Sequence, residues 1–167
     1  MISAGIERGL FVGAIVVAAG LLVQESYAAS AAKRSVPFSY ESLNELVMAG
    51  IESGEYPQMV DTRPLVDEDN LDVGGFEELH VPKSMPIPGC DIENAPEGAA
   101  AQINKNELVI VISAEGDEAS FEACASVFPN SQNLTGGVLG WIDNGGYEEY
   151  GEWIVPSADG MAGGGCL

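Results

Sequence analysis

The most regular hydrophobic pattern in the chain is a run of apolar residues near its middle. Residues 107–112 read Glu-Leu-Val-Ile-Val-Ile and show no polar alternation after the first position. This pattern predicts a strand that is buried on both faces, as in a parallel sheet covered by helices. A short segment, 113–118, then separates the strand from a stretch with helical spacing, 118–128. The inward face of that helix is expected to contain Phe121, Cys124, Ala125 and Phe128.

Strand-like and helix-like segments alternate on both sides of this run. A helix is expected to begin at Ser39, which caps it, and to end near Gly54. Its apolar face is expected to contain Leu43, Leu46, Val47 and Ile51. The other expected elements are a short strand over 58–64 stopped by proline, a loop-rich stretch over 65–89, a weak helix over 97–105, a strand over 132–134 and a helix over 138–142. This alternation predicts an α/β fold with a central, mainly parallel sheet.

Residues 1–35 lie outside this pattern and are expected to direct export. Residues 9–23 form an apolar run without a charge or an amide, and Arg8 precedes it. A run of this length matches a secretory signal peptide, and small-residue cleavage sites end at Ala28 and Ala31. Runs rich in glycine and alanine also span membranes when neighbouring helices pack closely against them.

We therefore expect one of two arrangements. The favoured one is a single-pass signal anchor, a hydrophobic N-terminal helix that carries an extracytoplasmic, periplasmic domain. The alternative is a secreted or periplasmic protein released by cleavage. In either case residues 36–152 are expected to form one domain, and residues 153–167 a flexible glycine-rich tail.

The charge of the chain narrows the range of partners. Its 167 residues include 26 acidic and 6 basic ones, which gives a formal net charge of −20. Because Glu7, Glu25, Arg8, Lys33 and Arg34 precede the domain, residues 36–167 keep 24 acids and three basic residues. Such a surface repels nucleic acid and anionic lipid headgroups. It indicates either a basic partner protein or solubility in a salty medium.

Three motifs around the buried strand resemble those of rhodanese-like domains. Residues 80–88, His-Val-Pro-Lys-Ser-Met-Pro-Ile-Pro, resemble the family pattern H-x-P-x-A-x-x-I-P, and Val-Asp-Thr-Arg at 60–63 resembles the D-x-R strand before it. Residues 134–141, Leu-Thr-Gly-Gly-Val-Leu-Gly-Trp, followed by Gly146 and Tyr147, are similar to the closing G-G-x-x-x-W and G-[YF] pattern. The resemblance covers roughly residues 38–150 and implies a three-layer domain.

The resemblance also implies a sulfur-transfer site, but the segment 113–118 departs from it. Active rhodaneses begin this loop with a cysteine that takes up sulfur as a persulfide. Aligning the loop glycines places Ser113 at that position, and a serine without an adjacent base is a poor nucleophile. The acidic side chains of the loop would repel an anionic donor such as thiosulfate. We therefore expect no catalytic residue in a degenerate loop made of Ser113, Ala114, Glu115, Gly116, Asp117 and Glu118.

The three cysteines offer little as replacements. Cys90 follows the histidine motif, and Asp91 beside it would raise the pKa of its thiol. Cys124 is expected to be a small core residue. Cys166 belongs to the expected tail. An exported protein could pair two of these cysteines, but their spacing does not say which.

The sequence does not predict a zinc site, a serine-hydrolase triad or a calcium site. His80 alone cannot form a zinc site and is expected to pack or hydrogen-bond structurally. A triad of Ser113, His80 and Asp61 lacks the G-x-S-x-G setting of a serine hydrolase. The acidic residues Asp67, Glu68, Asp69 and Asp72 lack EF-hand spacing and indicate a solvated loop rather than a calcium site. Trp141 is expected in the core, and Trp153 is expected as a partner or lid contact. We expect no metal and no cofactor.

These observations lead to one hypothesis and two alternatives. The hypothesis is a catalytically inactive rhodanese-like domain, not an enzyme, that acts as an accessory or docking subunit of a membrane protein complex. Residues 9–23 would hold it in the membrane, and its acidic face would meet a basic partner protein. The first alternative is an exported sulfurtransferase or sulfur carrier that uses another cysteine. The second is a module that binds a small cationic or neutral ligand at the altered loop, where the following helix begins.

Overall fold

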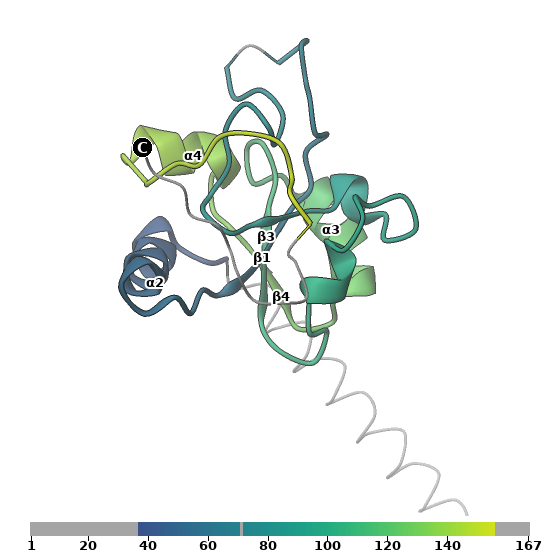
Figure 1. The fold of residues 1–167 in the computed structure, drawn as a ribbon, viewed down its shortest axis with the longest axis horizontal. Helices are drawn as coiled ribbons and strands as arrows, with labels where there is room; N and C mark the ends of the chain where they lie inside the picture. Colours follow the sequence, from purple (N-terminus) through teal and green to yellow (C-terminus); the bar gives the residue numbers. More distant parts are fainter. Residues whose placement is uncertain (1–36, 71, 156–167) are drawn as a thin grey trace, which may run out of the picture. The chain divides into compact units, whose positions relative to one another are not determined.

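The structure, a computed structural model, describes residues 37–70 and 72–155. Its sheet has four parallel strands in the order β2-β1-β3-β4 (Figure 1). The strands are β1 (Gln58–Asp61), β2 (Met85–Pro86), β3 (Val109–Ile112) and β4 (Ser131–Asn133). Every residue of β3 is buried, as the uninterrupted apolar run predicts. Asp61 pairs in register with Ile112, so the ends of β1 and β3 lie at the same edge of the sheet.

The helical segments are α2 (Tyr40–Ser53), η1 (Pro88–Cys90), η2 (Ala100–Gln102), α3 (Glu118–Val127) and α4 (Gly137–Asp143). The predicted caps of α2 are confirmed. The Ser39 hydroxyl accepts a hydrogen bond from the Ser42 amide at 3.2 Å, and Gly54 ends the helix in the left-handed conformation. The weak helix expected over 97–105 is limited to the single turn of η2.

Two hydrophobic clusters lie on opposite faces of the sheet. One joins α2 and α4 to Met59, Ile110 and Ile112, and the other joins α3 and η1 to alternate residues of the same strands, among them Val60 and Val111. Figure 1 shows α2 and α4 on one side of the strands and α3 on the other. This arrangement confirms the predicted three-layer α/β fold with a central parallel sheet.

The predicted inner face of α2 is wrong at two positions. Leu46 is 42% exposed and Ile51 is 45% exposed, whereas Leu43, Val47 and Gly50 are buried. A methyl group on Gly50 would lie only 2.7 Å from the ring of Tyr56. Glycine has no side chain, so this ring can approach the backbone of α2. The buried face of the helix is therefore centred on position 50, and Leu46 and Ile51 lie at the borders of that face.

The packed part of the domain includes Trp153, which the prediction placed at the start of a flexible tail. Its indole N–H donates to the Glu97 carbonyl at 3.0 Å, and its ring packs against the cluster on the α3 side. It also contacts Phe76 edge to face, with ring centroids 6.5 Å apart. Trp153 is therefore a half-buried packing residue of this domain.

The predictions for the N-terminal segment fall outside the described residues. These are the hydrophobic helix, the anchor at 9–23 and the cleavage sites after Ala28 and Ala31. The same applies to the tail beyond residue 155, which contains Cys166. In the described ranges, no helix has the length and apolar character needed to cross a membrane.

Candidate functional site: a closed loop at the edge of the sheet

The segment 113–118 connects the end of β3 to the start of α3, as predicted. Ser113 is only 2% exposed, and its hydroxyl oxygen accepts two hydrogen bonds from the loop itself. The Gly116 amide donates at 2.9 Å and the Asp117 amide at 3.2 Å. Backbone amides at this place would otherwise be free to bind an anion. The serine oxygen therefore occupies the centre of the loop.

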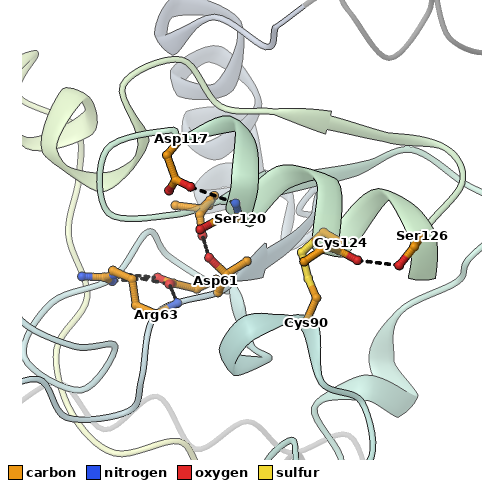
Figure 2. The surroundings of a disulfide bond; sticks show 10 residues. Asp61, Arg63, Cys90, Asp117, Ser120, Cys124 and Ser126 are labelled. Atoms are coloured by element: carbon orange, nitrogen blue, oxygen red, sulfur yellow. Dashed lines mark hydrogen bonds and ion pairs between the residues drawn. A yellow bond between two sulfur atoms is a disulfide. The ribbon is translucent and has the colours of Figure 1, made fainter.

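The start of α3 is closed by a second side chain. Asp117 is the N-cap, and its carboxylate accepts a hydrogen bond from the Ser120 amide at 2.8 Å (Figure 2). This bond is the main cause of the lowered pKa of Asp117, so the side chain is ionised at neutral pH. The sequence analysis placed Asp117 in the degenerate loop but did not recognise it as the cap. The signal that could have indicated it is an aspartate directly before the stretch with helical spacing.

The loop backbone is packed against the N-terminal end of α4. The amide of Val138 donates to the Ser113 carbonyl at 2.9 Å, and the amide of Leu139 donates to the Ala114 carbonyl at 3.0 Å. Gly116 has a φ of +75°, and a methyl group there would lie 2.6 Å from the Leu134 carbonyl oxygen. Only glycine fits this left-handed, crowded position. The loop is therefore held closed from two sides.

The charge around the loop is negative. Glu115, Asp117 and Glu118 have exposed side chains. The basic side chains of the described residues make their contacts elsewhere: Arg63 binds Asp61, Lys83 binds Glu149, and Lys105 lies over the ring of Phe128. Among the residues that the structure describes, no cation compensates the charge of the loop, so these carboxylates repel an approaching anion.

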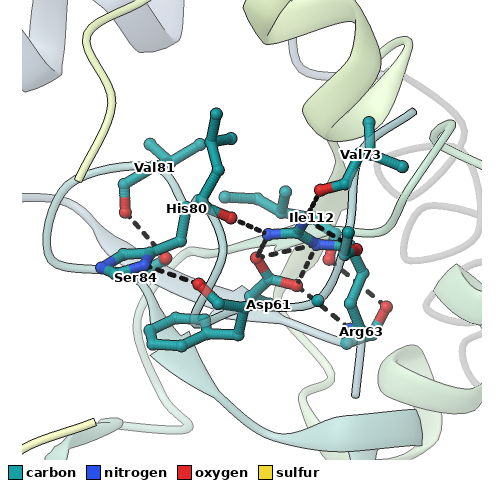
Figure 3. Close-up of polar contacts among 12 residues, drawn as sticks. Asp61, Arg63, Val73, His80, Val81, Ser84 and Ile112 are labelled. Atoms are coloured by element: carbon teal, nitrogen blue, oxygen red, sulfur yellow. Dashed lines mark hydrogen bonds and ion pairs between the residues drawn. The ribbon is translucent and has the colours of Figure 1, made fainter. Parts of the chain in front are cut away.

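The Asp61–Arg63 pair is structural. Both side chains are buried, and their closest approach is 2.7 Å. The same guanidinium donates to backbone carbonyls of the loop that follows, those of Val73 at 3.0 Å, Gly74 at 3.3 Å and Leu79 at 2.6 Å (Figure 3). Arg63 therefore fixes the course of the loop-rich stretch after β1.

His80 is also structural, as predicted. Its ring stacks on Phe76 with centroids 3.9 Å apart, and its Nδ1 lies 2.8 Å from the Phe76 carbonyl oxygen. Burial lowers the pKa of His80 and outweighs the opposite effect of that hydrogen bond and of Glu149. Ser113, His80 and Asp61 each bind other groups, so they do not form a triad.

The cysteines differ from the prediction. Cys90 in η1 and Cys124 in α3 form a disulfide, with their Cα atoms 5.1 Å apart (Figure 2). Cys124 is thus buried, as expected, but it is not a free core thiol. Cys90 is buried as well, rather than an accessible loop thiol. Spacing along the chain could not indicate this pair, because the sheet and α3 must first bring the two residues together.

No metal centre is found in the described residues. Within 37–70 and 72–155, no three histidine, cysteine, aspartate or glutamate side chains gather in a way that could hold an ion. This includes Asp67, Glu68, Asp69 and Asp72 of the acidic loop.

Among known proteins, the chain is similar to several solved structures. No family model matches the chain, and no curated protein matches it. The BH2092 protein from Bacillus halodurans is 22% identical, with 76% of this chain and 85% of that chain covered and a TM-score of 0.49. A rhodanese-like domain protein from Staphylococcus aureus is 20% identical, with 70% and 98% covered and a TM-score of 0.45.

A third similar structure is the thiosulfate sulfurtransferase from Pseudomonas aeruginosa. It is 23% identical, with 72% of this chain but only 21% of that chain covered and a TM-score of 0.48. Identities and scores at this level assign no activity to the present chain.

Proposed function

We propose that this chain is a rhodanese-like protein without sulfurtransferase activity that serves as an accessory or docking subunit of a membrane protein complex. The observation that carries the proposal is the bonding of Ser113. Its hydroxyl oxygen fills the loop in which the family's cysteine sulfur would sit, and it accepts the Gly116 and Asp117 amides. A buried serine held in this way has neither the chemistry nor the access for sulfur transfer.

The electrostatics of the loop support the same conclusion. A sulfur donor such as thiosulfate is an anion and needs free backbone amides or a cation for binding. In this loop the Asp117 carboxylate already caps α3, and Glu115 and Glu118 add negative charge. This arrangement also disfavours an anionic small ligand at the start of the helix, but it does not count against the small cationic or neutral ligand of the second alternative.

The disulfide supports export of the domain. Disulfides persist mainly in oxidising compartments, and cytosolic thiols are kept reduced. A cross-link between Cys90 and Cys124 therefore agrees with a segment at 9–23 that acts as a signal anchor or signal peptide. It also counts against the sulfurtransferase alternative at Cys90, because a disulfide sulfur is not available as a thiolate. Cys166 stays the candidate for that alternative.

Persulfide formation tests the inactive site. The full-length protein is incubated with thiosulfate, and the mass of each cysteine-containing peptide is then measured, with an active rhodanese as the positive control. We expect no added sulfur on the wild type. We also expect none on Ser113→Cys at position 113, because the new thiol would be buried in an acidic loop. Sulfur on Cys166 would replace this proposal with the sulfur-carrier alternative.

Membrane partition tests the docking role. The protein is extracted from its native host in a mild detergent, separated by size, and its intact mass is measured. A full-length chain that migrates with a large assembly is the expected result. A chain that begins near Ala29 or Ala32 and is found free in the soluble envelope fraction would contradict it.

A further inference from the structure

An open groove lies between α2 and the segment after α4, away from the closed loop. Its volume is about 560 Å³. The helix side is formed by Tyr40, Asn44 and Met48, which recur at the spacing of one helix face. The other side is formed by Gly145, Gly146, Tyr147, Glu148 and Tyr150. Tyrosine and methionine in an exposed groove are typical of surfaces that bind other proteins.

Side-chain contacts hold the two sides of the groove in a fixed position relative to each other. The ring of Tyr40 contacts Trp141 edge to face at 5.4 Å, and its hydroxyl donates to the Asn144 carbonyl at 2.9 Å. Gly146 packs against the face of Trp141, where a larger residue would clash. These contacts join α2 to the segment that follows α4. The groove is therefore preformed, which lowers the entropy cost of binding.

The backbone hydrogen bonds of Glu149 determine which side chains of the segment after α4 face the groove. Glu149 is paired with His80 through two backbone hydrogen bonds, and its side chain contacts Lys83 at 3.3 Å. Its neighbours, Glu148 and Tyr150, line the groove. Tyr147 is 56% exposed and Tyr150 is 66% exposed, so more than half of the surface of each residue is accessible.

The charge of both sides limits what can bind. Glu148 is the charged residue among those that line the groove. The elements that carry the lining, residues 40–53 and 143–152, contain six further acids and no lysine or arginine: Glu41, Glu45, Glu52, Asp143, Glu149 and Glu152. Glu148 accepts a hydrogen bond from the Tyr150 hydroxyl, which holds the carboxylate next to that tyrosine. A guanidinium or ammonium group is attracted both by a carboxylate and by the face of a tyrosine ring.

We propose that this groove docks a basic segment of a partner protein, with an arginine or lysine placed against the Glu148 carboxylate and an exposed tyrosine ring, and an apolar side chain against Met48. The inference rests on the proposed docking function and names the surface and the chemistry of the partner. It differs from a general attraction to the acidic domain, because it depends on a few side chains that can be changed singly.

Binding of defined peptides to the full-length protein in mild detergent tests the proposal. The probe is a ten-residue peptide that alternates arginine and leucine, and the control peptide has glutamate in place of arginine. Affinity is measured by calorimetry at about physiological salt, where general attraction between exposed charges is largely screened. We expect the basic peptide to bind and the acidic peptide not to bind.

Three variants locate the site. Glu148→Gln is expected to weaken binding about 5- to 10-fold, and the double variant Tyr147→Ala, Tyr150→Ala by about 50-fold or more. The matched control Glu122→Gln, which removes the same charge from an exposed position on α3, is expected to change the affinity less than about twofold. Circular dichroism spectra confirm that each variant is folded.

Three outcomes would overturn the inference. Equal losses from Glu148→Gln and Glu122→Gln would mean general charge attraction, and equal binding of both peptides would mean a merely apolar surface. A concentration-dependent dimer that the tyrosine variants abolish would mean that a second copy of the chain fills the groove. If the basic peptide does not bind but the protein still migrates with a membrane assembly, this inference fails while the proposed function stands.

Discussion

Cys90 in η1 and Cys124 in α3 are joined by a disulfide although 34 positions separate them along the chain. Both sulfur atoms lie in the cluster that α3 forms with one face of the sheet. The bond therefore ties the segment after β2 to the helix that follows the closed loop. It closes one large chain segment, which reduces the conformational freedom of the unfolded state.

Removal of this disulfide is expected to destabilise the domain. The double variant Cys90→Ala, Cys124→Ala should lower the free energy of unfolding by about 3–4 kcal/mol, as expected for a loop of this length. Urea unfolding measures the effect, and Cys166→Ala serves as the control because it leaves the bond intact. A double variant as stable as the wild type would contradict the prediction, as would three free thiols in protein prepared without reductant.

The hydrogen bonds of Ser113 give a second prediction. Ser113→Ala leaves the Gly116 and Asp117 amides without their acceptor in a part-buried loop, which should cost about 1–3 kcal/mol of unfolding free energy. The control is Ser126→Ala, since that exposed hydroxyl only donates to a carbonyl within α3. Urea unfolding should show a larger loss for the first variant. Equal losses would mean that the serine does not hold the loop.

Much of the fold was predictable because the patterns that indicate its strands and helices lie within short stretches of sequence. The apolar run at 108–112 has no polar position, and Ser39 and Gly54 are strong cap residues, so β3 and α2 follow from short stretches of sequence. The wrong predictions concern features that depend on contacts between residues far apart in the sequence. The ring of Tyr56 sets the buried stripe of α2, and the fold alone brings Cys90 to Cys124.

The candidate site was predictable in its location but not in its bonding. The loop after the buried strand was expected to be the site, and Ser113 was expected to lack the chemistry of a cysteine. The closure of the loop depends on the direction of the Ser113 hydroxyl and on the approach of α4, which only the folded backbone determines. The tyrosine groove joins α2 to the segment after α4, two parts that no short pattern connects.

The buried Asp61–Arg63 pair gives a third prediction. Arg63→Met leaves the Asp61 carboxylate buried without its partner and removes the donor to three loop carbonyls. Loss of one member of a buried ion pair costs about 3–5 kcal/mol. We expect the variant to be strongly destabilised or not to accumulate in folded form. Lys105→Met, which removes an exposed charge, is the control for expression and urea unfolding.

A partial rescue separates the two effects of Arg63. Arg63→Met combined with Asp61→Asn removes the buried negative charge but leaves the carbonyls of Val73, Gly74 and Leu79 without the guanidinium. The double variant should therefore recover part, but not all, of the stability lost by Arg63→Met. Full stability in Arg63→Met alone would contradict a structural role for the pair.

The lowered pKa of His80 gives a pH-dependent prediction. Because burial lowers its pKa in the folded state below the ordinary value of 6.5, the folded protein disfavours the charged ring more than the unfolded chain does. The contribution of the neutral ring is therefore complete above about pH 6.5 and is lost as the pH falls further. Between about pH 7.5 and about pH 5 the unfolding free energy of the wild type should fall more than that of His80→Gln.

The comparison with His80→Gln is needed because protonation of carboxylates also changes stability in acid. Those changes are shared by both proteins, so the difference between their unfolding free energies isolates the histidine. Glutamine keeps a group able to bond the Phe76 carbonyl but does not titrate. Urea unfolding at both pH values should give a destabilisation by His80→Gln that is smaller in acid. A destabilisation that stays constant with pH would mean that His80 takes up its proton equally well in the folded and unfolded protein.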